Sequence, residues 1–181
     1  GEVEACGGSP GRPAVPGSCS GELDGNGFRI KNLPAARFQT LSGARIHDLV
    51  IEDASVTSSQ SGILANVIQH QSLIENVFLV DSSISNGVDG LGAFAGRLVN
   101  STIRRSASVN ISVRGLVAVG GIVGKTDSGA LIEDCYVTGK IQVTYDHPSL
   151  GARPGGVAGV QRSVSRRQCA TQAPTISPAT N

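Results

Sequence analysis

The chain has 181 residues, with 24 glycines but only four phenylalanines, two tyrosines, no tryptophan and no methionine. This length suits one domain, whose core must be built from Val, Ile, Leu and Ala, and such residues fit a narrow, evenly layered interior. The net charge of +1 and the lack of aromatic residues among the basic ones exclude a nucleic-acid-binding protein. No apolar run reaches the ~18 residues that span a bilayer, so we expect no membrane span.

The charge is distributed unevenly along the chain. Residues 1–90 hold ten acidic and five basic residues, a net charge of −5, whereas residues 91–181 hold four acidic and ten basic residues, a net charge of +6. A globular fold would mix the two halves. A linear fold would keep them apart and give the molecule a dipole along its axis.

Residues 1–20 are rich in Gly, Pro and Ser, and we interpret them as an N-terminal loop or cap. Cys6 and Cys19 flank this segment, and we expect them to form a disulfide in an oxidising compartment. Cys135 lies in an apolar phrase, where a buried thiol and a bridge to Cys169 are equally acceptable interpretations.

Residues 23–33 open with a turn and continue as a strand. Asp24-Gly25-Asn26-Gly27 is a strong turn signal, and Phe28 and Ile30 alternate after it. The same four residues resemble part of a calcium loop, but the twelve-residue spacing and the closing Glu of such a loop are missing. A turn is therefore preferred.

An Ile-led, β-branched phrase occurs four times, at steps of 28, 29 and 29 residues. A fixed period in this range indicates a repeat architecture, in which like residues stack above like. We expect one interior ladder, and its members are Ile46, Ile74, Ile103 and Ile132. A neighbouring column should hold Leu49, Val77, Ser106 and Cys135.

A glycine-framed apolar phrase recurs on the same period, most fully at residues 116–124. Gly permits positive φ and close approach of a second backbone, which a sharp turn between stacked chains requires. The repeat glycines are Gly62, Gly92, Gly96, Gly121, Gly124, Gly156 and Gly159. A flexible linker would not place Ile and Val between its glycines at a fixed period.

Each period contains two or three short strands and no helical stripe. The predicted fold is therefore all-β, a parallel β-helix with about 29 residues in each coil, stacked at ~4.8 Å. Repeats should occupy residues 21–160, and residues 161–181 should form a Ser/Thr/Pro-rich tail. The basic residues of that tail, Arg162, Arg166 and Arg167, could meet an acidic partner.

The glycine phrases resemble the GLUG repeat, named for Gly-Leu-hydrophobic-Gly. Residues 121–124 and 156–159 match in form, whereas residues 62–65 lack the last glycine and residues 93–96 the first. The resemblance covers about residues 21–160. It implies a right-handed β-helix in secreted or surface-attached bacterial proteins, including adhesins and the non-catalytic region of IgA-specific metallopeptidases. It implies no catalytic residue and no cofactor.

The sequence offers few candidates for chemistry. Asp48 and Asp134 could be the clustered acids of a polysaccharide-active β-helix, but Asn76 and Arg105 fill the column between them, and turn residues are the favoured interpretation. His47, His70 and His147 are isolated, and the His-Glu-x-x-His motif of the peptidases is absent, so we predict no metal ligands.

We therefore expect a non-catalytic extracellular β-solenoid that serves as a scaffold or as an adhesion or protein-binding surface. One alternative is a subunit that assembles head to tail into a fibre, acidic end to basic end. A polysaccharide-active enzyme is the remaining alternative. The expected partners are a protein or a second copy of the chain.

Overall fold

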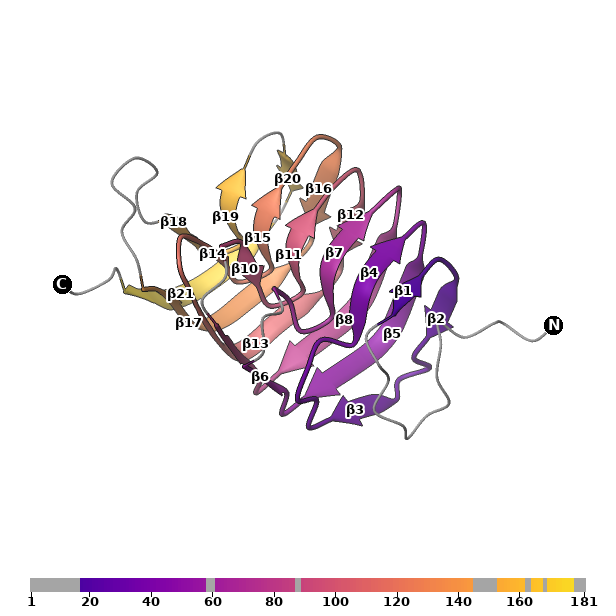
Figure 1. The fold of residues 1–181 in the computed structure, drawn as a ribbon, viewed down its shortest axis with the longest axis horizontal. Helices are drawn as coiled ribbons and strands as arrows, with labels where there is room; N and C mark the ends of the chain where they lie inside the picture. The colour runs from indigo at the N-terminus through magenta and orange to yellow at the C-terminus, as the bar shows by residue number, and fades with distance from the viewer. Residues whose placement is uncertain are drawn as a thin grey trace.

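The architecture is a single stack of coils, seen in a computed structural model that describes residues 17–57, 61–86, 89–144, 153–161, 164–167 and 169–177. Within those residues every element is a β-strand, and all hydrogen-bonded neighbouring strands run parallel to each other. The chain advances from the N-terminus to the C-terminus along the long axis of the molecule (Figure 1). The all-β parallel solenoid expected from the sequence is confirmed.

Three stacks of strands form the sides of the solenoid. The first is a six-stranded sheet made of β1 (Ser18–Cys19), β4 (Phe38–Ser42), β7 (Ala65–Gln69), β11 (Ala95–Leu98), β15 (Val123–Thr126) and β19 (Ala158–Gln161). The second is a three-stranded sheet made of β10 (Leu91–Gly92), β14 (Ala118–Gly120) and β18 (Arg153–Gly155). The third is a 12-stranded sheet made of β2 (Glu22–Asp24), β3 (Arg29–Lys31), β5 (Arg45–Glu52), β6 (Ser55–Val56), β8 (Leu73–Val80), β9 (Ser83–Ser85), β12 (Thr102–Arg104), β13 (Ala107–Gly115), β16 (Ala130–Glu133), β17 (Tyr136–Val143), β20 (Val164–Arg167) and β21 (Ala170–Ser177).

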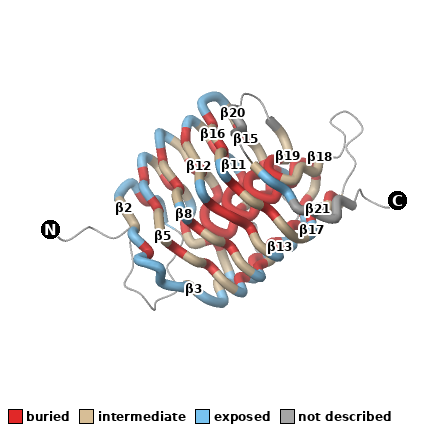
Figure 2. Tube along the Cα trace, turned by 180° about the vertical axis from the view of Figure 1, so that it is seen from behind, coloured by how far each residue is buried: buried red, intermediate tan, exposed pale blue. Residues whose placement is uncertain are grey.

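The predicted isoleucine ladder is present. Ile46 pairs with Ile74, Ile74 with Ile103, and Ile103 with Ile132, and all four side chains are fully buried. Leu49 and Val77 are likewise in register, and Val77 N–H donates to Ser106 Oγ in the next coil. Figure 2 shows the buried positions running through the middle of the stack from coil to coil.

The repeat glycines are needed for close packing and not for a positive φ. A Cβ at Gly62 would lie 2.1 Å from Ala65 O, and one at Gly121 would lie 2.2 Å from Gly156 O. No side chain fits where two backbones approach this closely. A Cβ would also meet backbone atoms within 2.6 Å at four other predicted glycines, Gly92, Gly96, Gly124 and Gly159. At Gly156 it would meet the side chain of Thr171, at 2.7 Å.

Positive φ instead occurs mainly at Asn and Asp in the turns. Asp48, Asn76, Arg105 and Asp134 occupy one column, with φ of 53, 53, 48 and 50°. Asn and Asp tolerate this left-handed conformation better than other L-residues, and Arg105 is the exception in the column. These dihedral angles support the interpretation of Asp48 and Asp134 as turn residues.

The solenoid extends beyond both predicted boundaries. β1 pairs with β4 inside the segment expected to be a loop, although residues 1–16 lie outside the described part. In the expected tail, β20 pairs with β16 and β21 with β17, with Ile176 beside Ile141. Thr171, Thr175 and Ile176 are β-branched residues that favour the extended conformation of this extra coil. Since coil order follows chain order, the described parts of the acidic and basic halves of the sequence stay apart.

The two C-terminal cysteines are thiols, not a disulfide. Cys135 Sγ donates to Glu133 O at 3.1 Å, and the hydrogen bond with Cys169, together with burial, raises the pKa of the Cys135 thiol. Cys19 is buried, but Cys6 lies outside the described residues, so the Cys6–Cys19 disulfide stays a prediction.

A search of the described segments for a helix long and apolar enough to cross a membrane finds none.

Two neighbouring serines test the packing of the core. Ser108 is fully buried between Leu79 and Val137, and no described residue hydrogen-bonds its hydroxyl. We expect Ser108→Ala to raise the free energy of unfolding by about 1 kcal/mol, because it removes an unsatisfied buried hydroxyl. Urea titration followed by circular dichroism measures the change.

Ser106→Ala is the matched control. Ser106 Oγ accepts from Val77 N–H at 3.1 Å and donates to Arg104 O at 2.8 Å, so its loss leaves two buried backbone groups unpaired. We expect that variant to lose about 2 kcal/mol. If Ser108→Ala lowered the free energy of unfolding as much as Ser106→Ala does, this description of the core would be contradicted.

Candidate functional site

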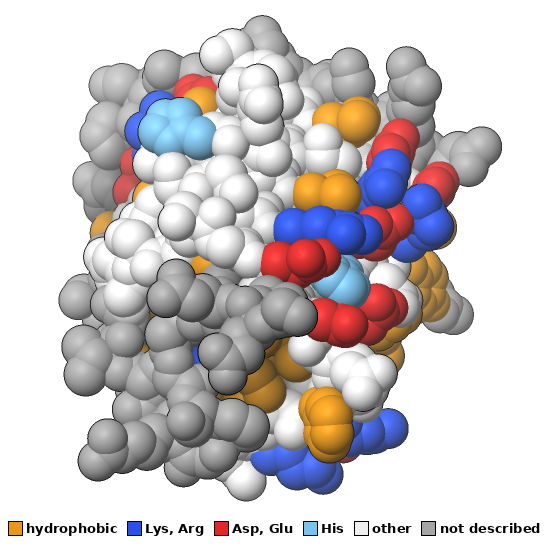
Figure 3. Space-filling view, turned by 90° about the vertical axis from the view of Figure 1, so that its right-hand side faces the viewer, with side chains coloured by type: hydrophobic (Ala, Val, Ile, Leu, Met, Phe, Trp, Pro, Cys, Tyr) orange, Lys and Arg blue, Asp and Glu red, His pale blue; other side chains and the backbone are white. Residues whose placement is uncertain are grey.

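The outward-facing side chains of the first two coils form a charged cluster. β2 lies beside β5 with Glu22 opposite Arg45 and Asp24 opposite His47. Since successive side chains of a strand point to opposite faces, these pairs share the outer face while Leu23 and Ile46 face inward. Figure 3 shows acidic and basic side chains gathered on one side of the N-terminal end.

His47 lies at the centre of this cluster, with its side chain only 12% exposed. Its Nε2 is 2.9 Å from Glu22 Oε1, and its Nδ1 is 2.7 Å from Asp48 Oδ2 and 3.6 Å from Asp24 Oδ1. The hydrogen bond with Asp48 makes the largest contribution to raising the pKa of His47. Glu22 and Asp24 add to this effect, while burial and Arg45 oppose it.

Asp48 is held in the cluster by its backbone and by a neighbour in the next coil. Its left-handed conformation, with φ of 53°, ends the first half of β5. Asn76 Nδ2 donates to Asp48 Oδ1, which leaves Oδ2 facing His47. The hydrogen bonds from His47 and Asn76 lower the pKa of Asp48, so this carboxyl is ionised under ordinary conditions.

The turn Asp24-Gly25-Asn26-Gly27 is built against β5. Gly25 N–H donates to His47 O and Gly27 N–H donates to Asp48 O, each at 2.8 Å. A Cβ at Gly25 would lie 2.4 Å from Asp48 O, so only glycine brings this turn so close. Asn26 N–H donates to Asp24 Oδ1 at 2.8 Å and fixes that carboxylate in the turn.

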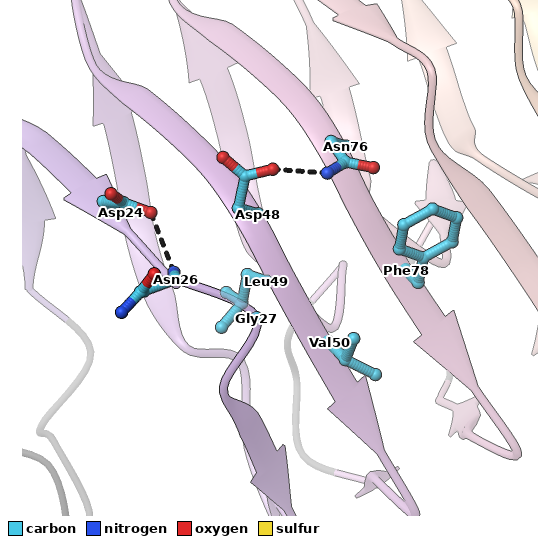
Figure 4. A pocket seen from close by; sticks show the side chains of 8 residues that line it. All are labelled: Asp24, Asn26, Gly27, Asp48, Leu49, Val50, Asn76 and Phe78. Carbon is cyan, nitrogen blue, oxygen red and sulfur yellow. Dashed lines mark hydrogen bonds between the residues drawn. The ribbon is translucent and has the colours of Figure 1, made fainter.

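A shallow pocket of about 270 Å³ lies beside this turn. Figure 4 shows Asp24, Asp48 and Asn76 lying side by side on successive coils at the pocket wall. The complete lining is Asp24, Asn26, Gly27, Asp48, Leu49, Val50, Asn76 and Phe78. The pocket is therefore polar on the side of the carboxylates and apolar along β5 and β8.

Opposite charges alternate along the column that contains His47. Register places Asp24, His47, Glu75, Arg104 and Glu133 on successive coils. Glu75, whose side chain is 13% exposed, accepts from Arg105 at 2.9 Å and from Arg104 at 3.1 Å. This alternation stabilises the stack through opposite charges at each step.

The structure brings some of the predicted site residues together and keeps others apart. Asp48 and Asp134 do not meet, because the coils that carry Asn76 and Arg105 lie between them, as expected. His47 was expected to be isolated, but stacking brings it to Asp24 and Asp48, whose donor atoms lie within 4.8 Å of one another. His70 contacts Ser42 Oγ at 2.8 Å. His147 and the side chains of Arg162, Arg166 and Arg167 lie outside the described part.

Stability should depend on pH through His47. Because the folded-state pKa is raised above the ordinary value near 6.5, the protonated ring favours folding. This stabilisation is complete below about pH 6.5 and is lost as the pH rises through the folded-state pKa. Urea unfolding from about pH 6 to about pH 9, in buffer with a chelator, should show His47→Gln losing this slope.

His70→Gln is the control for that measurement, since the His70 ring contacts the Ser42 hydroxyl at 2.8 Å and lies outside the charged cluster. It should keep the pH slope of the unmodified chain. A His47→Gln variant with an unchanged slope would contradict the cluster.

Comparison with known families agrees with the repeat and its resemblance. Residues 14–80 match the model described as M26 IgA1-specific Metallo-endopeptidase N-terminal region, and residues 115–142 match the GLUG motif. An immunoglobulin A1 protease of Streptococcus sanguinis is 31% identical over 159 residues, which cover 80% of this chain and 8% of that protein. One from Streptococcus pneumoniae serotype 4 is 28% identical and covers 79% of this chain and 9% of its own length.

The fold recurs in a solved structure. The crystal structure of a candidate immunoglobulin A1 protease from Bacteroides ovatus superposes with a TM-score of 0.71 at 19% identity, covering 87% of this chain and 62% of that one. At this identity the likeness shows the fold alone. The chain spans less than a tenth of the length of the streptococcal relatives. Together these matches confirm the resemblance: the chain carries the GLUG motif and is similar to the N-terminal region of M26 IgA1-specific metallo-endopeptidases.

Proposed function

We propose that the chain is a non-catalytic β-solenoid of a secreted or cell-surface protein, where it acts as a rigid scaffold and presents a surface to a protein partner. The observation that supports this most directly is the parallel register of the isoleucine ladder through four successive coils. This register holds the aliphatic ladder inside, while the outward-facing positions can carry different side chains without disturbing the core. Similarity to the N-terminal region of much longer proteases supports a role beside a catalytic region.

A polysaccharide-active enzyme is less consistent with the geometry. Asp48 and Asp134 are three coil steps apart, about 14 Å at the usual spacing of ~4.8 Å, whereas paired glycosidase carboxyls lie about 5–9.5 Å apart. Asp24 is much closer to Asp48. However, the lowered pKa of Asp48 makes it a poor general acid, and Asp24 is already held by Asn26 N–H.

Head-to-tail assembly is a second candidate, because the linear order of coils preserves the charges of the two halves, −5 and +6. Opposite ends of two copies would attract each other, and an interface of this kind does not close into a ring. The attraction would be screened by salt.

Scattering distinguishes the two candidates. For a scaffold we expect small-angle X-ray scattering of the 181-residue chain to report a monomer whose particle dimensions are unchanged between low and high salt. Particle mass that grows with concentration at low salt and falls at high salt would favour head-to-tail assembly instead.

Activity assays test the non-catalytic character. Incubation of the chain with IgA1, casein and a panel of polysaccharides should release no product, whereas immobilised IgA1 or another host glycoprotein should retain the chain. Turnover that disappears in Asp48→Asn or Asp134→Asn would contradict the proposal. Both substitutions keep a residue that tolerates the left-handed conformation, so the turn is preserved.

A further inference from the structure

We infer that Asp24, His47 and Asp48 form a binding site for one divalent transition-metal ion, with Zn²⁺ the best match. The site goes beyond the scaffold role, and the scaffold role stands whether or not it is found. His47 Nδ1 and one carboxylate oxygen from each Asp all lie within 4.8 Å of one another. The ligands come from two coils, with Asp24 in β2 and the other two residues in β5.

The spacing of the donor atoms fits a zinc ion. Bonds of 2.0–2.1 Å in tetrahedral geometry place neighbouring ligand atoms about 3.3 Å apart. His47 Nδ1 is 2.7 Å from Asp48 Oδ2 and 3.6 Å from Asp24 Oδ1, which brackets that value. Small side-chain rotations of the exposed Asp24 and Asp48 would widen the shorter distance and admit the ion.

Each ligand has a second partner that orients it. Glu22 Oε1 lies 2.9 Å from His47 Nε2. On a neutral ring this carboxylate holds the hydrogen on Nε2, and Nδ1, which otherwise contacts Asp48 Oδ2 at 2.7 Å, can then bind the ion. Asn76 Nδ2 donates to Asp48 Oδ1, and Asn26 N–H donates to Asp24 Oδ1. A carboxylate on the far side of a metal-binding imidazole is the usual outer partner of such ligands.

The charges of the cluster also favour a divalent cation. Three carboxylates, from Glu22, Asp24 and Asp48, surround the His47 ring, and Arg45 pairs with Glu22. With a neutral imidazole, as a metal ligand must be, these groups carry a net charge of −2, which one divalent ion neutralises. An imidazole ligand favours Zn²⁺, Ni²⁺ or Cu²⁺ over Ca²⁺ and Mg²⁺, which prefer oxygen ligands.

The site is open to solvent on one side. The side chains of Asp24 and Asp48 are 55% and 44% exposed, while that of His47 is 12% exposed. An ion could therefore enter from the solvent and keep water in its remaining coordination position. Bound there, the ion would join the first coil to the second, where β2 and β3 have only three residues each against eight in β5.

Calorimetry and thermal unfolding of the 181-residue chain, stripped of metal with a chelator and dialysed, test the site. At about pH 7, Zn²⁺ should bind with a stoichiometry of one and, at one hundred times its Kd, raise the Tm by at least about 5 °C. His47→Gln, Asp24→Asn and Asp48→Asn should each weaken binding at least about 100-fold, and Glu22→Gln about 10-fold.

His70→Gln and Asp81→Asn are the matched controls, because each changes the same residue type outside the cluster and should leave the affinity unchanged. ¹⁵N-detected NMR of the imidazoles in the unmodified chain gives a readout that does not need a folded variant. Zn²⁺ should shift Nδ1 of His47 and leave the signals of the other two histidines in place.

Three results would overturn the site. They are the absence of saturable binding, a shift at His70 or His147 in place of His47, and an equal effect of millimolar Ca²⁺ that survives in His47→Gln. The last would show carboxylates attracting cations without the imidazole.

Discussion

The structure depends on parallel coils stacked in register, residue above residue. Hydrogen bonds between successive strands fix the spacing along the axis, so each position of the repeat becomes a column. Inward columns must then carry side chains that pack on themselves. Ile46, Ile74, Ile103 and Ile132 satisfy this requirement, and all are fully buried. The few aromatic residues follow from the same constraint, because a narrow interior leaves little room for rings.

The same register decides how polar groups are accommodated. Buried serines at the turns bond to the neighbouring coil: Ala44 N–H donates to Ser72 Oγ, and Ser72 N–H donates to Ser101 Oγ. Outside, Glu75 lies between His47 and Arg104 in a column where the sign of charge alternates. A regular backbone therefore turns single residues into rows of contacts, whether the contact is apolar, hydrogen-bonded or ionic.

The period made the core predictable from the sequence, but it could not reveal the charged cluster. The isoleucine ladder repeats every 28 or 29 residues, so counting alone identifies it. Asp24 and His47 are only 23 residues apart, because the first coil is shorter than the others. Phe28 departs from its predicted place in a strand for the same reason: the turn leaves it outside β3 and 72% exposed. The C-terminal coil was missed because its sequence is rich in Ser, Thr and Pro, and only pairing with β17 shows that it is a strand.

The first coil also affects whether a second copy of the chain can stack on this end of the solenoid. An edge of long, flat strands is a template for another chain, and proteins avoid this with short strands, charges and bends. Here β1, β2 and β3 have two, three and three residues, whereas β5 and β8 behind them have eight each. The turn at Gly25 interrupts the edge, and the carboxylates of Glu22 and Asp24 are already engaged with Arg45 and His47. Among the described residues, this end therefore has the features of a protected edge. A second copy stacking on this end would meet short strands and carboxylates that are already paired, which argues against the head-to-tail alternative and in favour of the lateral binding surface that we propose.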